Sequence, residues 1–213
     1  MSLEEQLTTG LEGLGLDLDA ATQRRLMDYV ALIEKWNKVY NLTAVRDPEK
    51  MLTQHLLDSL AVLPHLVGRR IIDVGTGPGL PGIPLALANP ALDVTLLDSN
   101  HKKTSFLRQA CLELGLTNTT VICQRVEAWR PVERYDTVIS RAFSELAEFA
   151  DLARHLCADN GTMLAMKGIY PHEELTRLPP TVELLRVEQL KVPGLVAARH
   201  LVVFRPARTE ITG

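Results

Sequence analysis

The sequence predicts an α/β fold, a mostly parallel sheet covered by helices on both faces and preceded by a helical N-terminal extension. From Arg70 onward, apolar strand-like runs alternate with helical segments, a pattern typical of parallel sheets. The first run, Arg70–Val74, ends in a glycine-rich turn, as strands do where open α/β sheets bind a nucleotide or nucleoside. Two later runs flank Val192-Pro193-Gly194, which predicts an antiparallel pair that closes the sheet.

The N-terminal third predicts two helices. Apolar residues recur at three- and four-residue intervals over residues 19–40, with Asp19 as the N-cap. Trp36 and Tyr40 continue this stripe, and we expect both in the core. A second helix is predicted over residues 48–63, with Pro48 in its first turn.

The remaining elements follow the same alternation. Strands are predicted over residues 70–74, 94–97, 121–123, 137–139, 162–166, 182–190 and 200–205, and helices over residues 81–88, 102–114 and 144–156. We therefore expect a single globular unit with a helical extension over residues 1–66, a core over residues 67–206 and a tail over residues 207–213.

Composition restricts the class of protein. The 213 residues carry a formal net charge of −3, which argues against holding nucleic acid by bulk positive charge. No apolar run approaches the roughly 20 residues of a membrane span. The acidic N-terminus lacks the features of a signal peptide, and the 3 cysteines lack metal-ligand spacing. We expect a cytoplasmic protein without a metal site.

The glycine-rich turn is compatible with three classes of ligand. A phosphate-loop NTPase is excluded because no Lys-Ser or Lys-Thr follows the glycines. Gly77, Gly79 and Gly82 match the dinucleotide pattern G-x-G-x-x-G, but Pro81 interrupts it. Prolines also remove backbone donors that a pyrophosphate would need.

The third class is S-adenosylmethionine, which carries no phosphate. Asp73, Gly75, Gly77 and Gly79 alternate as in the acid-and-glycine loop of the seven-stranded methyltransferases. Asp98 ends the second predicted strand, where an acid accepts hydrogen bonds from ribose hydroxyls. Such an acid serves a dinucleotide equally well, and as a helix N-cap it would have a purely structural role.

Later residues extend this candidate site. Val126 and Glu127 follow the third strand and could flank an adenine. Arg141 follows the fourth strand at the ligand-binding edge, where it could meet a cofactor carboxylate, an RNA phosphate or a neighbouring acid. His55 and Asp58 are one helical turn apart, and we expect them to form a structural pair.

Six segments together carry a more specific resemblance. In order, they are Lys35-Trp36-Asn37-Lys38-Val39-Tyr40-Asn41-Leu42-Thr43, His55-Leu56-Leu57-Asp58-Ser59-Leu60, residues 73–84, Ile139-Ser140-Arg141-Ala142, Met166-Lys167-Gly168 and Arg199-His200-Leu201-Val202-Val203. This set resembles the ribosomal RNA small-subunit methyltransferase G family, also called glucose-inhibited division protein B. The resemblance reaches residue 205 and implies a seven-stranded class I, Rossmann-like methyltransferase fold.

The resemblance implies S-adenosylmethionine-dependent methylation of guanine N7 in the 530 loop of bacterial 16S rRNA, within the small ribosomal subunit or its precursor. It assigns cofactor contacts to Gly75, Leu80, Val126, Glu127 and Arg141, and the general methyltransferase pattern adds Asp73, Gly77 and Asp98. The expected RNA contacts are Lys102, Lys103, Lys167 and Arg199, although Ser105 stands where some relatives have arginine.

This chemistry needs no acid or base, because guanine N7 offers an in-plane lone pair and carries no proton. We therefore expect a positioning mechanism without a catalytic side chain. An NAD(P)-dependent oxidoreductase and a non-catalytic RNA-associated module of the same fold remain alternatives. We expect a monomer.

Overall fold

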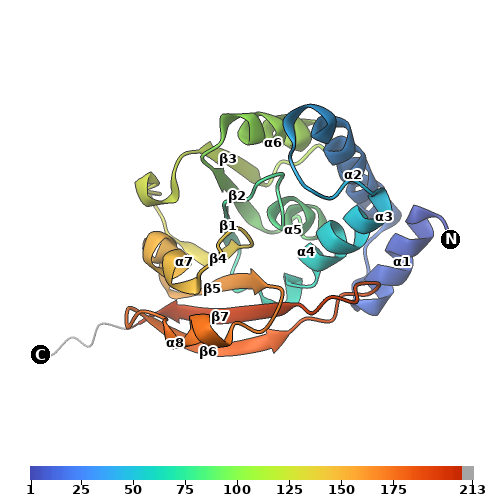
Figure 1. Ribbon diagram of the computed structural model, residues 1–213. Coiled ribbons are helices and arrows are strands. Elements are labelled where there is room, and N and C mark those ends of the chain that lie inside the picture. Colours follow the sequence, from blue (N-terminus) through green and yellow to red (C-terminus); the bar gives the residue numbers. More distant parts are fainter. Residues whose placement is uncertain (208–213) are drawn as a thin grey trace, which may run out of the picture.

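The computed structural model describes residues 1–207 as one seven-stranded sheet with helices on both faces (Figure 1). The strand order is β3-β2-β1-β4-β5-β7-β6. β7 is antiparallel to both of its neighbours, and the other pairs are parallel. The predicted α/β fold and antiparallel closing pair are confirmed. Of the tail predicted over residues 207–213, all but residue 207 lies outside the described residues.

The strands are β1 (Arg70–Val74), β2 (Asp93–Asp98), β3 (Thr119–Cys123), β4 (Tyr135–Ser140), β5 (Cys157–Lys167), β6 (Val182–Gln189) and β7 (His200–Pro206). The α-helices are α1 (Leu3–Gly13), α2 (Ala20–Tyr40), α3 (Pro48–Met51), α4 (Asp58–Leu60), α5 (Gly82–Ala88), α6 (His101–Glu113), α7 (Leu146–Ala153) and α8 (His172–Thr176). Shorter turns are the π-helical η1 (Leu52–Leu57) and the 3₁₀-helical η2 (Leu63–His65), η3 (Val126–Ala128) and η4 (Arg154–Leu156).

Alternate residues of each strand supply the two apolar layers. Ile71 and Ile139 belong to the cluster that includes residues of α1, α2, α5 and α6, whereas Ile72 and Val138 belong to the cluster under α7. Side chains of successive strand residues point to opposite faces, so both faces of this sheet are covered (Figure 1). Within residues 1–207, no helix is both long and apolar enough for a membrane crossing.

The N-terminal extension contains one helix more than expected. α2 begins and ends as predicted, with the Asp19 side chain accepting from Thr22 N at 2.7 Å and Asn41 in the left-handed conformation at φ 48°. α1 was missed. Its signal is a capping box, in which Ser2 accepts from Glu5 N while Glu5 accepts from Ser2 N.

The helix predicted over residues 48–63 is interrupted by a wider turn. Pro48 lies in the first turn of α3 as expected, but the chain continues as the six-residue π-helical η1 before α4. π-helical turns inside α-helices occur frequently at functional sites. This one displaces the side chains of residues 52–57 relative to a regular helix.

Of the two aromatic residues predicted to lie in the core, Trp36 packs against it and Tyr40 does not. Trp36 is partly buried and packs edge-on against Phe106, with ring centroids 5.7 Å apart. Tyr40 is 38% exposed and stacks on the outer face of Trp36, so its placement in the core was wrong. Tyr40 is the last residue of α2.

α2 also fixes the glycine-rich turn of the core. The buried Tyr29 hydroxyl donates to Pro78 O at 2.6 Å, across 49 residues of sequence. Arg25 donates to Leu114 O at 2.7 and 2.9 Å, which satisfies a carbonyl at the end of α6. The extension therefore stabilises both the turn after β1 and the helix after β2.

Replacing Tyr29 with phenylalanine is expected to lower the free energy of unfolding by about 1–3 kcal/mol, because the buried Pro78 carbonyl would lose its donor. Urea denaturation measures this change. Tyr40→Phe is the matched control, since no hydrogen bond of the Tyr40 hydroxyl occurs within residues 1–207, and it is expected to change stability by less than about 0.5 kcal/mol. Equal effects of the two substitutions would contradict this role of Tyr29.

Candidate functional site

Two cavities open side by side at the carboxyl edge of the parallel strands. The glycine-loop cavity, of about 340 Å³, lies over the ends of β1, β2 and β3 and is lined by Val74, Gly75, Leu97, Asp98, Ser99, Lys103, Gln124, Arg125, Val126, Glu127, Ala142, Phe143, Glu148 and Leu152. The arginine cavity, of about 330 Å³, is lined by Gln54, His55, Asp58, Arg141, Met166, Lys167, Gly168 and Arg199. Both lie near the switch point between β1 and β4, where open α/β sheets bind ligands.

The glycine loop is closed by one carboxylate. Asp73 Oδ2 accepts from Thr76 Oγ1 at 2.6 Å and from Gly82 N at 2.8 Å, so it joins the end of β1 to the start of α5. Within the loop that follows Asp73, Gly75 has a φ of 68°, a backbone conformation that is unfavourable for residues with a Cβ. A Cβ at Gly75 would also lie 2.8 Å from Ala142 Cβ, so a glycine is required there.

Asp73 itself is fully buried. Burial raises the pKa of its carboxyl from 3.8 to about 6, while the bonds from Thr76 and Gly82 oppose that shift. The second oxygen, Oδ1, has no partner within the described residues. Burial of this carboxylate is therefore electrostatically unfavourable, and its hydrogen bonds to Thr76 and Gly82 fix the geometry of the loop.

The start of α5 has no free donor for a pyrophosphate. Gly82 N donates to Asp73, Ile83 N donates to Gly79 O at 2.7 Å, and Leu85 N donates to Pro81 O. Pro84 has no N–H. Because dinucleotide sites use the free N–H groups at this position, the arrangement argues against the dinucleotide alternative.

Asp98 faces the glycine-loop cavity with capacity to accept further bonds. Its Oδ2 accepts from Gly77 N at 2.9 Å and its Oδ1 accepts from Asn100 N at 2.8 Å, which fixes the plane of the carboxylate. Each carboxylate oxygen can accept a second hydrogen bond. Asp98 is therefore pre-positioned to receive a diol such as the two hydroxyls of a ribose.

The rest of this cavity fits the adenosine part of S-adenosylmethionine. Val126 is partly buried and Glu127 is exposed, both at the turn η3 that follows β3. Leu97, Phe143 and Leu152 add apolar surface, and the backbone of Gly75 permits close approach. The volume lies within the roughly 300–1,000 Å³ typical of small-molecule sites. Four of the eight predicted cofactor residues line this cavity, namely Gly75, Asp98, Val126 and Glu127.

The other four predicted cofactor residues do not line it. Asp73 and Gly77 shape the loop from behind, and Leu80 is 2% exposed and packs into the apolar layer below. Arg141 lies in the wall between the cavities, with its side chain in the arginine cavity.

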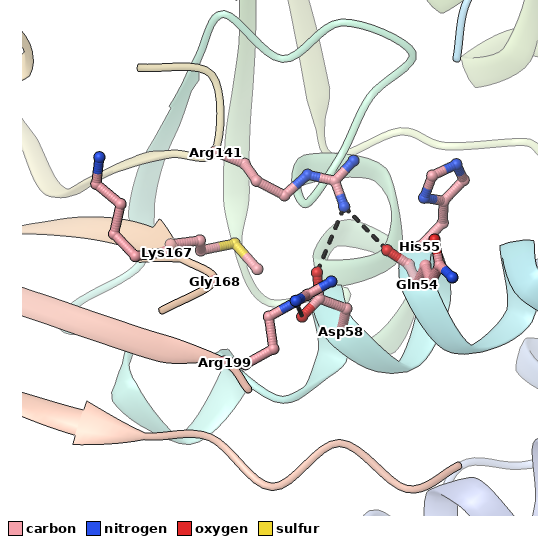
Figure 2. Close-up of a pocket in the computed structure, with 8 residues that line it drawn as sticks. Gln54, His55, Asp58, Arg141, Lys167, Gly168 and Arg199 are labelled. Carbon is pink, nitrogen blue, oxygen red and sulfur yellow. Dashed lines mark hydrogen bonds and ion pairs between the residues drawn. The ribbon is translucent and has the colours of Figure 1, made fainter. Parts of the chain in front are cut away.

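The arginine cavity is organised around a buried carboxylate (Figure 2). Asp58 is 1% exposed and lies between Arg199, whose Nε is 3.0 Å from Oδ1, and Arg141, whose Nη1 is 3.5 Å from Oδ2. Arg141 Nη1 also donates to Gln54 O at 3.0 Å. Burial raises the pKa of Asp58, and the two guanidinium groups oppose that shift. These contacts join Gln54 in η1 and Asp58 in α4 to Arg141, which follows β4, and to Arg199, which precedes β7.

The antiparallel direction of β7 explains why Arg199 reaches this edge. Lys167 at the end of β5 pairs with His200 at the start of β7, so the residue before β7 lies beside the carboxyl end of the parallel strands. A parallel strand would have placed that position at the opposite edge.

His55 forms a different contact from the one expected. Its Nε2 lies 3.0 Å from Thr43 Oγ1, and Asp58 binds the two arginines, so the predicted His55–Asp58 pair was wrong. Burial and the charge of Arg141 lower the pKa of His55 to about 4, so the ring is neutral at pH 7. Its Nδ1 is buried and has no partner within residues 1–207.

The four expected RNA-binding residues are in different settings. Lys102 is exposed, and Lys103 lies in the glycine-loop cavity with Nζ 3.9 Å from Asp98 Oδ2. Lys167 Nζ is bound by Glu174 at 2.7 Å and by Ser144 O at 2.6 Å, and in Figure 2 it points away from the two arginines. Of the four, only Arg199 forms an ion pair with Asp58 in the arginine cavity.

Two features of the site were not predicted from the sequence. The carbonyl of Gln54 contacts Arg141 from the π-helical turn, for which the sequence carries no clear signal. Lys103 belongs to the glycine-loop cavity, which its position two residues into α6, close to Asp98, could have indicated. No group of three or more His, Cys, Asp or Glu in residues 1–207 could hold a metal ion.

The strand order and the acid-closed glycine loop define a class I methyltransferase fold. Solved structures share it: TrmN from Thermus thermophilus aligns with a TM-score of 0.57 at 19% identity, over 73% of this chain and 53% of that one. An rRNA methylase from Streptococcus thermophilus aligns with a TM-score of 0.51 at 15% identity, over 71% of this chain and 95% of that one.

Sequence comparison identifies the family. The family model for rRNA small subunit methyltransferase G matches residues 22–202. The chain is 57% identical to the ribosomal RNA small subunit methyltransferase G of Laribacter hongkongensis, over 95% of this chain and 98% of that protein. It is 56% identical to that of Nitrosospira multiformis, over 97% and 99%. The chain belongs to the rRNA small subunit methyltransferase G family, which confirms the resemblance seen in the sequence.

Gly75→Ala is expected to weaken S-adenosylmethionine binding by about 10- to 100-fold, because the new Cβ would push the 142 region into the cavity. Isothermal titration calorimetry measures the affinity. Gly115→Ala is the control: Gly115 has a similar φ of 61° but no atom within 4 Å of the added Cβ. It should cost stability without changing affinity, and a similar loss of affinity in both variants would refute the steric argument.

Asp73 is expected to make stability fall as pH rises. Its pKa is raised from 3.8 to about 6 in the folded state, so its contribution is complete below pH 4 and is lost as pH passes 6. The free energy of unfolding of the wild type minus that of Asp73→Asn should therefore decrease by about 2 kcal/mol between pH 4 and pH 7.

Urea denaturation at a series of pH values measures this difference. His55, with its pKa lowered to about 4, destabilises the fold as pH falls from 6.5, but it does so in both proteins and cancels. A difference that is constant with pH would show that the Asp73 carboxyl has the same pKa in the folded and unfolded chains.

Proposed function

We propose that the protein transfers the methyl group of S-adenosylmethionine to N7 of a guanine in the 530 loop of bacterial 16S rRNA. One observation carries this proposal: a single turn forms the wall between the two cavities. Arg141 lines the arginine cavity, while Ala142 and Phe143 line the glycine-loop cavity. A methyl donor in one cavity and a base in the other would meet across this turn, as direct transfer requires.

The residues of the chain act by binding and alignment. Asp98 would accept hydrogen bonds from the ribose hydroxyls, and Val126 with Leu97 would contact the adenine. The bound cofactor supplies an electrophilic methyl group on a sulfonium. Guanine N7 carries no proton, so none of the side chains around the cavities has to remove one. His55, with its pKa lowered to about 4, stays neutral and is not required as a base.

Alignment of this kind lowers the barrier without an acid or base. Holding two reactants in near-attack geometry contributes up to roughly 7–11 kcal/mol in ideal intramolecular systems. Here the alignment depends on a rigid wall. Gly75 packs against Ala142, and Ser140 Oγ donates to Val74 O at 2.7 Å, so the ends of β1 and β4 are held together.

The substrate assignment is supported by the relatives' name and by the family's expected reaction. The small ribosomal subunit or its precursor would be the partner, and the bacterial cytoplasm the site of action. The monomeric state, the domain boundaries and the individual RNA contacts remain predictions.

The test incubates the protein with unmodified 30S subunits and with naked 16S rRNA, using methyl-labelled S-adenosylmethionine. Nuclease digestion and mass spectrometry then locate the label. We expect 7-methylguanosine at one position in the 530 loop. Label in another nucleotide would disprove the substrate assignment.

Titrations with NAD and with S-adenosylmethionine, together with this assay, separate the alternatives. Tight binding of NAD without binding of S-adenosylmethionine would favour the oxidoreductase. Binding of cofactor and RNA without turnover on either substrate would favour the non-catalytic module.

A further inference from the structure

The arginine cavity contains more hydrogen-bond donors than the protein itself uses. Arg199 donates through Nε to Asp58 and through Nη1 to Ala198 O, and Arg141 uses only Nη1. Arg199 Nη2, Arg141 Nε and Arg141 Nη2 have no partner within residues 1–207. These N–H groups line a cavity of about 330 Å³ and are available to a ligand.

The position of this cavity favours the reacting base as its ligand. The turn that holds Arg141, Ala142 and Phe143 borders both cavities, so a base here lies next to the cofactor cavity. On the reacting edge of guanine, N7 and O6 are neighbours. N7 must stay free of donors because its lone pair attacks the methyl carbon, so a donor at this edge can bind only O6.

Asp58 determines where these donors lie. Two guanidinium groups repel each other, and the buried carboxylate between them is their shared partner, with one oxygen facing each (Figure 2). Asp58 begins α4 directly after the π-helical turn and is 1% exposed, so the fold fixes it. It therefore sets the position of both arginines.

We propose that Asp58 is a positioning residue that holds Arg141 and Arg199 so that their free N–H groups bind O6 of the target guanine and thereby select guanine. Adenine presents an amino group where guanine presents O6, so a wall of donors rejects it. This inference rests on the proposed function and adds the atom that is recognised.

The test varies the target base and the protein together. Reconstituted 30S particles carry guanosine, inosine or 2-aminopurine riboside at the methylated position. Inosine keeps O6 and N7 but lacks the 2-amino group, whereas 2-aminopurine keeps N7 and lacks O6. For the wild type we expect kcat/KM to be similar for guanosine and inosine and about 10- to 100-fold lower for 2-aminopurine.

Asp58→Asn and Arg199→Ala should each reduce the guanosine-to-2-aminopurine ratio of kcat/KM towards 1. Comparing ratios between proteins cancels the intrinsic reactivity of each base, and a merely structural defect would lower both rates without changing the ratio. Asp47→Asn, at the N-cap of α3 and outside the cavity, is the matched control and should keep the wild-type ratio. Affinity for S-adenosylmethionine, measured by calorimetry, should be unchanged in all three variants.

Each opposite outcome is informative. A wild type that uses 2-aminopurine as well as guanosine overturns the inference even if the variants fail to fold. A variant ratio equal to that of the wild type overturns it as well. Loss of discrimination in Asp58→Asn but not in Arg199→Ala would likewise overturn it, because Arg199 would then not contribute to the recognition of O6. No methylation of the guanosine particle by the wild type would instead refute the proposed function.

Discussion

The site depends on the hydrogen bonds that Asp73 accepts at the end of β1. Thr76 and Gly82 both donate to the same carboxylate oxygen, so the chain must leave the sheet, turn through its glycines and enter α5 within nine residues. That path brings Gly77 N to Asp98 and the Gly75 backbone to Ala142. The bonds hold a fully buried carboxyl whose pKa is raised to about 6, so loop geometry is maintained against an electrostatic cost.

Two departures from regular structure assemble the arginine cavity. The π-helical turn places Gln54 O and Asp58 towards the sheet edge, and the antiparallel β7 returns Arg199 to that edge. Arg199 and Asp58 are 141 residues apart in sequence, and Arg141 and Asp58 are 83 apart. The cavity exists only when the extension, β4 and β7 are all folded, which couples the N-terminal helices to the candidate site.

The sequence predicted what local patterns encode. The acid at the end of β2 and the alternating glycines identified Asp98 and Gly75, because a strand end and a positive φ require particular residue types. The role of Asp58 was missed because its partners are distant in sequence and nearest-turn spacing suggested His55 instead. Tyr40 was wrongly predicted to lie in the core, because helical periodicity shows which residues share one face of a helix. It does not show how far neighbouring elements cover that face.

The two cavities differ in charge in a way that matches two different ligands. The glycine-loop cavity has three carboxylates, Asp98, Glu127 and Glu148, against two cations, Lys103 and Arg125. The arginine cavity has one carboxylate against three cations, of which Lys167 is paired with Glu174 outside the lining. The excess of carboxylates favours a cationic ligand in the first cavity, and the excess of guanidinium donors favours a hydrogen-bond acceptor such as a base carbonyl in the second. A chain with a net charge of −3 can therefore bind RNA through a local excess of guanidinium groups, with shape supplying the remaining selectivity.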